Sequence, residues 1–462
     1  MKRENEFVYL KFYNNLKEQI LSGLIEPGSF LMSESDLCRH YELSRNSVRK
    51  ALEQLVNDNL VIKKNGQGTI VNPELVIDRS PSQTLHIFAP TPATFVDTIL
   101  PSLIQEYKVR YPNVEVKVYS LPYNVSFLQS IKKYMEMGII PDLILLSDMH
   151  FPEISNNSAY EDLDLTLSSS LERLYPKLVD RFTVDGHIKA APIMFTTVHL
   201  VYNRPLFERS GVPLPGKDWS LEVFLDAAQR LTLADDKGII RQYGFAIMPK
   251  TLRWPVVALQ NGLKQVRNEE ELSRTISSSL EFLQDLIHRK RWGLLYRLAH
   301  ERNPFFYGKA AMVLATGYEV SHWTQDKMAF DIGYAPLPFG PINATILRSN
   351  GFMIPEAARK KELARSFILT ALSPAVQAKI AEGTPYLSVI RPVNEAIHSS
   401  DYLSQVNALE HQMEENYFET ELFSDLHQAF DLDADMDLFW LGLEEPAELD
   451  SLFRQIYREG KS

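Results

Sequence analysis

Residues 33–71 predict two short helices, a tight turn and a hairpin, and few folds contain these elements in this order. Ser33 followed by Asp36 is typical of a capped helix start, and after a two-residue turn Ser44 can cap a second helix. The apolar residues of that second helix recur at helical spacing, at Val48, Ala51, Leu52 and Leu55. Two helices joined in this way form a helix-turn-helix.

A glycine turn follows the second helix. Residues 61–64 and 69–71 are short runs suited to strands, and Asn65-Gly66 between them is a strong hairpin signal. A hairpin placed directly after a helix-turn-helix is a wing. Apolar residues at near-helical spacing over residues 7–24 predict one more helix upstream. We therefore predict a winged helix-turn-helix domain over residues 1–75.

The first turn of the second helix carries hydrogen-bond donors. Arginine can bind guanine bidentately and asparagine can bind adenine, which makes Arg45, Asn46 and Arg49 candidates for base contacts. The residues suited to phosphates or sugars are Ser44, Ser47, Lys50, Lys63 and Lys64. On a lone helix such cations would more simply be a solvated face, but here they coincide with the turn and the wing. The pattern predicts binding to double-stranded DNA.

The net charge of −11 at first argues against a nucleic-acid partner. The charge is unevenly distributed, however. Residues 1–79 carry eleven Lys or Arg and eleven Asp or Glu, residues 80–400 carry 34 and 32, and residues 401–462 carry 3 and 16. The acidity therefore lies in the C-terminal segment, and a neutral N-terminal domain can still gather its cations on one face.

Composition limits the remaining possibilities. A length of 462 residues, with 45% hydrophobic and 23% charged residues, indicates a globular protein of at least two domains. The first residues lack a signal-peptide pattern, and no apolar run of about eighteen residues follows, so we expect a cytoplasmic protein without a membrane partner. The single cysteine, Cys38, excludes an internal disulfide, and the histidines show no metal-ligand spacing. We expect neither a metal site nor a cofactor.

From residue 84 onward, strands alternate with helices. Strands are predicted over residues 85–89, 114–119 and 142–147, and helices over residues 95–110 and 127–137. Such alternation predicts a parallel, doubly wound α/β sheet. Prolines, serines and charges without periodicity place a linker at residues 76–83. The second domain then spans residues 84–462, and its acidic, mostly helical end after residue 401 is predicted to pack on the rest of the domain.

The stretch SESDLCRHYELSRNSVRKALEQLVNDNLVIKKNGQGTIV closely resembles the winged-helix DNA-binding domain of the GntR family of bacterial regulators. The resemblance implies that Arg45 and Arg49 contact bases or phosphates, with Ser44 and Ser47 beside them, and that Gly66 lies at the wing's minor-groove contact. Ser35 stands where the family often has arginine, so one DNA contact of the family is missing or replaced. DNA-binding domains of this kind usually act as dimers, and we expect a homodimer.

Residues 84–462 resemble the extracellular solute-binding proteins of sugar uptake systems. The best matches are PDLILLSD at 141–148, APIMFTTVHLVYNRPLFERSGVPLP from residue 191 and NGFMIPEAARKKELARSFILTALSP from residue 350. The resemblance implies a type II periplasmic-binding-protein-like domain with two α/β lobes joined by a hinge and the ligand between them. Sugar sites combine aromatic faces with a few fixed polar groups. The implied effector-binding residues are Thr91, Asp148, Trp254, Tyr318 and Trp323, with the two tryptophans as stacking aromatics; core packing is the alternative for each aromatic residue.

The sequence thus predicts a multidomain α/β regulator whose affinity for its DNA operator is controlled by a small molecule, in first place a sugar or oligosaccharide. An amino acid or another non-carbohydrate ligand could fill the same fold. An aminotransferase-like GntR fusion is less favoured, because no lysine stands in a Schiff-base motif. Dinucleotide, P-loop, nucleophile-elbow and zinc-protease motifs are also missing, so we predict no enzyme activity. The acidic end as a docking surface for another protein is a third possibility.

Overall fold

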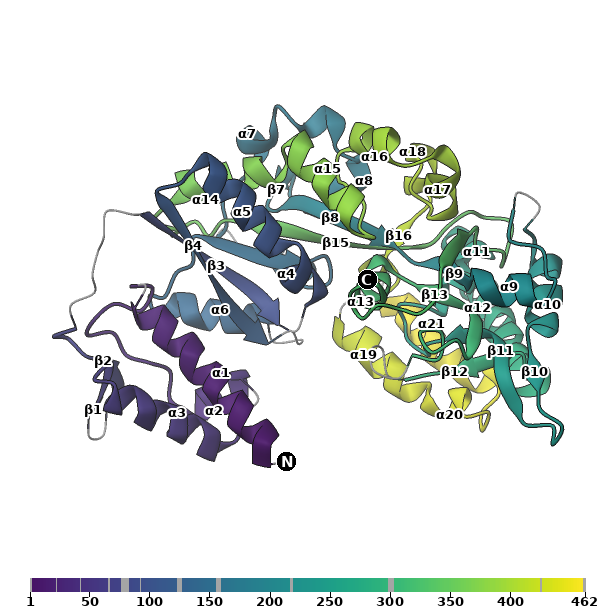
Figure 1. Cartoon of the computed structure of the whole chain (residues 1–462), viewed down its shortest axis with the longest axis horizontal. Coiled ribbons are helices and arrows are strands. Elements are labelled where there is room, and N and C mark those ends of the chain that lie inside the picture. The colour runs from purple at the N-terminus through teal and green to yellow at the C-terminus, as the bar shows by residue number, and fades with distance from the viewer. Residues whose placement is uncertain are drawn as a thin grey trace. The chain divides into compact units, whose positions relative to one another are not determined.

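The computed structural model (Figure 1) describes residues 2–21, 23–41, 43–64, 67–75, 83–91, 93–122, 127–154, 159–216, 219–297, 303–423 and 426–459. The chain divides into two packed units. The first comprises Met1–Glu172, Val179–Ile193 and Asn350–Val376, and the second comprises Arg173–Leu178, Met194–Ser349 and Gln377–Ser462. The elements that contribute residues to both units are η2 (Leu171–Arg173), α8 (Pro176–Arg181), β8 (Ala191–Thr197), β15 (Ile346–Met353) and α15 (Pro374–Gly383).

A winged helix-turn-helix opens the first unit, as predicted. Its elements are α1 (Lys2–Leu21), α2 (Glu34–Tyr41), α3 (Arg45–Asn57), β1 (Val61–Lys64) and β2 (Gly68–Val71). The Ser33 hydroxyl caps α2 by accepting a hydrogen bond from the Asp36 N–H at 3.2 Å, and Ser44 caps α3 in the same way. The predicted apolar stripe of α3 is buried, and β1 pairs antiparallel with β2 to form the wing.

The larger part of the first unit is an α/β lobe. It contains β3 (Gln83–Thr91), α4 (Thr94–Thr98), α5 (Leu100–Arg110), β4 (Val114–Pro122), α6 (Phe127–Glu136) and β5 (Leu143–Ser147). β3 pairs parallel with β4 and with β5, as predicted, but β15 joins β5 antiparallel. The sheet is therefore mixed. The single helix predicted over residues 95–110 is two helices, because Pro101 lacks an N–H and sits in the first turn of α5.

Smaller elements complete the first unit. They are η1 (Phe151–Ile154), α7 (Asp164–Leu167), η2 (Leu171–Arg173), β6 (Thr183–Val184), β7 (His187–Ile188) and α14 (Lys361–Ala371), and the last residue of η2 belongs to the second unit. The predicted linker lies almost wholly outside the described residues, which begin again at Gln83.

The second unit has its own mixed sheet, in the order β10-β11-β13-β9-β14 with β12 beside β11. β11 pairs parallel with β12 and β13, and the other pairs are antiparallel. The strands of this sheet are β9 (His199–Asn203), β10 (Leu233–Ala234), β11 (Ile240–Ile247), β12 (Gly293–Leu295), β13 (Ala310–Ala315) and β14 (Ile332–Ala335). The remaining strand of the unit, β16 (Tyr417–Phe418), pairs parallel with β15 instead. The helices before residue 400 are α9 (Arg204–Arg209), α10 (Leu221–Arg230), α11 (Pro255–Gln260), η3 (Leu263–Gln265), α12 (Glu269–Gln284), η4 (Asp285–Arg289), α13 (Gly317–Gln325) and α16 (Arg391–Ile397).

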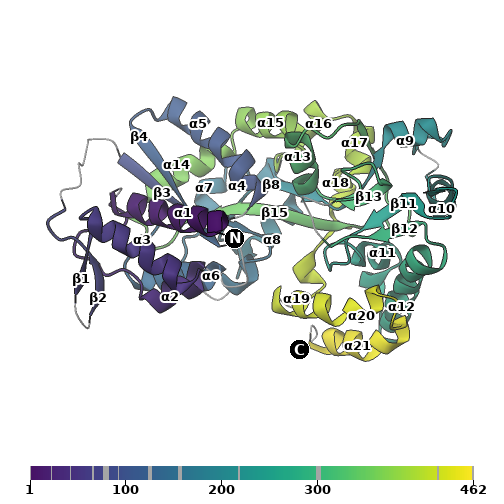
Figure 2. The same ribbon diagram turned by 60° about the horizontal axis from the view of Figure 1, so that its bottom comes forward.

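The acidic end of the chain is helical and packs on this second sheet domain, as predicted. Its elements are α17 (Ser400–Gln405), α18 (Glu410–Met413), η5 (Glu419–Glu421), α19 (Leu426–Asp435), α20 (Asp437–Trp440), η6 (Pro446–Leu449) and α21 (Asp450–Glu459). Phe423, Trp440 and Phe453 belong to one hydrophobic core with Leu280 of α12. Figure 2 shows α21 running beside α12, and Arg458 binds Glu269 through two hydrogen bonds of 2.7 and 2.8 Å.

No helix within the described ranges is long and apolar enough to span a membrane.

Candidate DNA-binding surface and effector domain

The exposed side of α3 presents the polar residues predicted to contact DNA. Arg45, Asn46, Arg49 and Lys50 are exposed. Ser44 is exposed and Ser47 half-buried, and their hydroxyls lie 2.9 Å apart at the helix cap. For Arg45, the described residues supply no hydrogen bond or ion pair. Its guanidinium is therefore available to a ligand outside the chain.

Two other predicted contacts already have partners within the domain. The Arg49 Nε donates a hydrogen bond to the Glu34 carboxylate of α2 at 2.8 Å. The Lys50 ammonium lies 4.0 Å from the centre of the Tyr9 ring, which is cation–π distance. Both side chains remain exposed, so DNA can compete for them. The cost of releasing Arg49 from Glu34 is small, because water screens exposed ion pairs and they contribute little to stability.

The wing carries the remaining predicted contacts. Lys63 and Lys64 of β1 are both exposed, and Lys64 pairs with Gly68 across the hairpin. Gly66, predicted at the minor-groove contact, lies outside the described residues. The roles of all these residues in DNA binding stay predictions.

The winged helix packs directly on the α/β lobe of the first unit (Figure 2). The Tyr41 hydroxyl of α2 shares a hydrogen bond with the Tyr134 hydroxyl of α6. The Asn15 amide of α1 donates to the Ser120 carbonyl of β4 at 3.0 Å. One hydrophobic cluster contains side chains from both sides of the contact, among them Phe12, Leu16, Leu37, Tyr119, Ile131 and Tyr134.

Ion pairs surround this contact between the winged-helix domain, called the head from here on, and the α/β lobe. Lys133 of α6 pairs with Asp36 of α2, and Lys117 of β4 pairs with Glu18 of α1 at 3.1 Å. Lys133 and a hydrogen bond from Ser33 hold the pKa of Asp36 below its ordinary value. The head is thus attached by apolar packing, hydrogen bonds and charge pairs together.

His40 lies at the centre of this contact. Its side chain is only 7% exposed, and its ring centre lies 5.2 Å from that of Tyr134. Burial, with a smaller contribution from the Lys133 charge, lowers the pKa of His40 to about 4. The imidazole is therefore neutral at neutral pH, and burial raises the pKa values of Tyr41 and Tyr134.

Two predicted effector residues lie together in the first unit. Thr91 ends β3 and is half-buried, while Asp148 directly follows β5 and is fully buried. β3 and β5 are parallel neighbours, so both residues lie at the carboxyl edge of one sheet, where open α/β sheets bind ligands. The Arg181 guanidinium donates a hydrogen bond to the Asp148 carbonyl.

The three predicted aromatic residues lie in the second unit. Trp254 and Trp323 are only 1% and 2% exposed. The Trp254 ring centre lies 5.6 Å from that of Phe453, and the Trp323 ring centre lies 5.1 Å from that of Phe305. Both indoles therefore pack in hydrophobic cores, and their use as sugar platforms stays a prediction. Tyr318 is half-buried against Tyr386.

A buried ion pair that was not predicted holds the helix bearing Tyr318. Arg253 pairs with Glu319 of α13, and both are almost fully buried. The Thr316 N–H also donates to Glu319, at 2.9 Å. Although burial raises it, the Arg253 charge and these hydrogen bonds keep the pKa of Glu319 below its ordinary value. The pattern Thr316-x-x-Glu319 is a capping box, which is the one sequence signal for this site.

Gly317 is also fixed by its surroundings. Its N–H donates to the Thr196 hydroxyl at 2.7 Å, and a Cβ atom there would lie 2.6 Å from the Pro385 carbonyl oxygen. Only glycine lets the start of α13 approach this backbone so closely.

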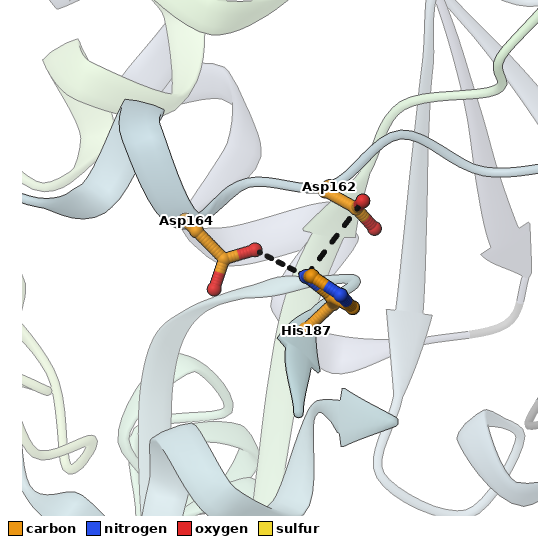
Figure 3. Close-up of side chains that lie close together, drawn as sticks. All are labelled: Asp162, Asp164 and His187. Carbon is orange, nitrogen blue, oxygen red and sulfur yellow. Dashed lines mark hydrogen bonds and ion pairs between the residues drawn. The ribbon is translucent and has the colours of Figure 1, made fainter. Parts of the chain in front are cut away.

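Figure 3 shows Asp162, Asp164 and His187 of the first unit turned toward one another. Their possible ligand atoms lie within 4.8 Å of one another, and the His187 Nδ1 is 3.4 Å from the nearest Asp164 oxygen. Lys189 binds Asp162 at 2.5 Å and lowers its pKa. Because an ammonium group already neutralises one carboxylate and the cluster is largely exposed, we interpret it as a surface ion-pair cluster and assign it no metal.

Residues 93–378, more than half of the 462-residue chain, match the family of bacterial extracellular solute-binding proteins. The chain belongs to this solute-binding protein family. Residues 8–71 of the same solute-binding protein match the bacterial regulatory proteins of the gntR family, so its N-terminal domain is a GntR domain. Both resemblances predicted from the sequence are confirmed. The two family descriptions name a regulator and a binding protein, and neither is a class of enzymes.

Curated relatives match short stretches of this chain. The arabinose metabolism transcriptional repressor of Halalkalibacterium halodurans is 38% identical over 66 residues, which are 14% of this chain and 17% of that protein. The transcriptional regulator GgaR of Escherichia coli is 36% identical over 69 residues, which are 15% of this chain and 28% of that protein. The chain thus spans less than a third of either relative.

Solved structures share the fold of the solute-binding domain. A substrate-binding protein of Listeria monocytogenes in complex with cycloalternan has a TM-score of 0.65 at 16% identity, covering 81% of this chain and 97% of that one. A solute-binding protein of Thermotoga lettingae bound with alpha-D-tagatose has a TM-score of 0.66 at 17% identity, covering 82% and 100%. UgpB of Mycobacterium tuberculosis, in complex with glycerophosphocholine, has a TM-score of 0.65 at 17% identity, covering 82% and 98%.

Proposed function

We propose that this solute-binding protein is a transcriptional regulator whose affinity for a DNA operator is controlled by a small molecule held by its solute-binding domain. The observation that carries the proposal is the presence, in one chain, of a GntR domain and a solute-binding domain. Such a protein acts where the DNA is, inside the cell, and it needs no catalytic step.

The effector that we propose is a sugar or an oligosaccharide. Support comes from structural neighbours described as complexes with cycloalternan and alpha-D-tagatose. The glycerophosphocholine complex of another neighbour favours one alternative, a polar phosphodiester. Because identities of 16–17% indicate the fold alone, the ligand class has to be decided by binding.

We assign the recognition of operator DNA to α3 and the wing. Arg45 and Asn46 are exposed at the first turn of α3, where recognition helices contact base edges. When DNA binds, the Arg49 side chain leaves Glu34 and contacts the DNA. The residues that bind phosphates or sugars are Ser44, Ser47, Lys50, Lys63 and Lys64. One short helix reads too few base pairs to be selective, so the protein binds paired half-sites as a homodimer.

The signal passes to DNA through the packed contact between head and lobe. The hydrogen bond between Tyr41 and Tyr134 and the ion pair between Asp36 and Lys133 tie the head to α6. A head held in this way follows any movement of its lobe, which changes the spacing of the two heads in a dimer. A coupling free energy of about 1 to 3 kcal/mol is typical of such control.

Thermal unfolding of the full chain tests the effector assignment. A panel of monosaccharides and oligosaccharides, with glycerophosphocholine beside them, is screened for a rise in the unfolding midpoint, because a ligand of the folded state raises it. A selective rise with one sugar supports the proposal. A rise with glycerophosphocholine alone would replace the carbohydrate by a phosphodiester as the proposed effector. An Arg45→Ala variant should bind DNA more weakly while keeping the same ligand response.

A further inference from the structure

A cavity of about 290 Å³ lies within the second unit, beneath α21. Its buried wall is formed by Trp254, which directly precedes α11, and by side chains of α12 and α21, together with Phe423. Residues 419–456, which supply part of this wall, belong to the acidic end of the chain. At about 30 Å³ per water molecule, the space corresponds to an organic molecule of about ten non-hydrogen atoms.

The chemistry of the wall excludes the ligand class proposed for the effector. Apart from Lys264 and Glu421, the described lining is aliphatic or aromatic, and includes Trp254, Leu272, Ile276 and Phe453. A sugar bound against this wall would find few hydrogen-bond partners on it, and each hydroxyl group buried without a partner costs about 1 to 3 kcal/mol. The cavity fits a molecule with an apolar body and one polar end.

The polar part of the cavity lining is one ammonium group, Lys264, and one carboxylate, Glu421. Glu421 is paired with Lys177, at 3.0 Å. The Lys264 ammonium hydrogen bonds instead to the Glu421 backbone carbonyl, at 2.9 Å. The described residues place no carboxylate oxygen within ion-pair distance of Lys264. Lys264 therefore makes no direct ion pair at the edge of an apolar space, and the Glu421 carboxylate, already paired with Lys177, acts on its charge only from a longer distance.

Tyr417 lies beside both cations. Its ring centre is 5.1 Å from the Lys177 ammonium and 5.5 Å from the Lys264 ammonium, so its π face adds to the positioning of both groups. Glu421 is held in turn by the Phe418 N–H, which donates to its second oxygen at 2.6 Å. The single carboxylate of the cluster is thus fully engaged, and Lys264 is the group left for a ligand.

We propose that this cavity is a second small-molecule site that binds a monocarboxylate with a medium-length apolar chain, with the carboxylate at Lys264 and the chain between α12 and α21. The site does not depend on the proposed carbohydrate effector, and Trp254, predicted from the sequence as a sugar platform, is assigned here to the apolar wall of the cavity. A failure of sugar binding would leave this proposal standing, and the reverse also holds.

Isothermal titration calorimetry on the full chain tests the site with three probes of equal chain length: sodium octanoate, 1-octanol and octylammonium chloride, all below micelle-forming concentrations. Octanoate should bind at one site per chain, with octanol weaker and octylammonium weakest. Lys264→Gln should weaken octanoate binding about five- to tenfold and leave octanol binding unchanged. Lys264 is exposed, so the substitution should not disturb folding.

The matched control is Lys237→Gln, an exposed lysine of the same unit outside the cavity lining, which should bind octanoate like the parent chain. A cavity-filling variant, Ile276→Trp, should abolish binding of both octanoate and octanol. Equal affinity for octanoate and octylammonium, or octanoate binding unchanged by Lys264→Gln, would reduce the site to unspecific apolar uptake and overturn the proposal. An absence of octanoate binding would overturn it outright.

Discussion

Acidification should destabilise the contact between the DNA-binding head and its lobe through His40. Burial places the pKa of His40 at about 4, below the ordinary value of 6.5, so the folded state favours the neutral ring. The stabilisation is complete above pH 6.5 and is lost as the pH falls from 6.5 toward 4. A difference of about 2.5 pKa units corresponds to about 3 kcal/mol at 1.36 kcal/mol per unit.

The measurement is urea unfolding at about pH 7.5 and about pH 4.5, followed by circular dichroism. All five tryptophans, at positions 219, 254, 292, 323 and 440, lie in the second unit, so tryptophan fluorescence reports that unit separately. His40→Gln should remove about 3 kcal/mol of the acid loss from the circular dichroism transition and leave the fluorescence transition unchanged.

His86→Gln is the matched control for His40→Gln. His86 is a buried histidine of the same unit, with a pKa also lowered to about 4 by burial, but it belongs to β3 of the lobe, where its ring shares a hydrogen bond with Tyr119 of β4. Both variants should reduce the acid loss, whereas only His40→Gln should reduce the acid sensitivity of DNA binding. The reasoning would be refuted if the parent chain and His40→Gln lost equal stability between the two pH values.

Three further substitutions test other parts of the structure. Trp323→Ala should destabilise the second unit by about 3 to 5 kcal/mol, seen in the urea midpoint, because the indole packs on Phe305 in a core; a change below about 1 kcal/mol would contradict that packing. Gly317→Ala should cost about 1 to 3 kcal/mol by thermal unfolding, since its Cβ would meet the Pro385 carbonyl, and an unchanged midpoint would contradict it. Arg45→Ala should weaken operator binding, measured by fluorescence anisotropy, by about 1 to 3 kcal/mol, and equal affinity would remove Arg45 from the interface.

The head could be predicted almost completely because its signals are local. Ser33 and Ser44 cap helices that start within three residues of them, and the hairpin signal lies between the two strands that it joins. The lobe was predicted less fully. β15 lies about 200 residues farther along the chain than β5 but pairs with it in the sheet, with Asn350 opposite Ser147. The residue pattern near β5 does not predict this antiparallel neighbour.

The site residues divide in the same way. The exposure of Arg45 and Asn46 follows from the helical pattern alone, but the partner of Arg49 comes from α2. A tryptophan is equally suited to a binding platform and to a core, so the burial of Trp254 and Trp323 required the tertiary structure. Arg253 and Glu319 are 66 positions apart, and neither residue type predicts a buried pair by itself.

The most direct test of the account is the affinity of the full chain for DNA with and without its effector. DNA fragments selected from a random library by the protein itself would serve as the operator, and the sugar that raises the unfolding midpoint would serve as the effector. We predict a change in operator affinity of about fivefold or more at saturating sugar, in either direction. An operator affinity that is unchanged by a sugar shown to be bound would contradict the account.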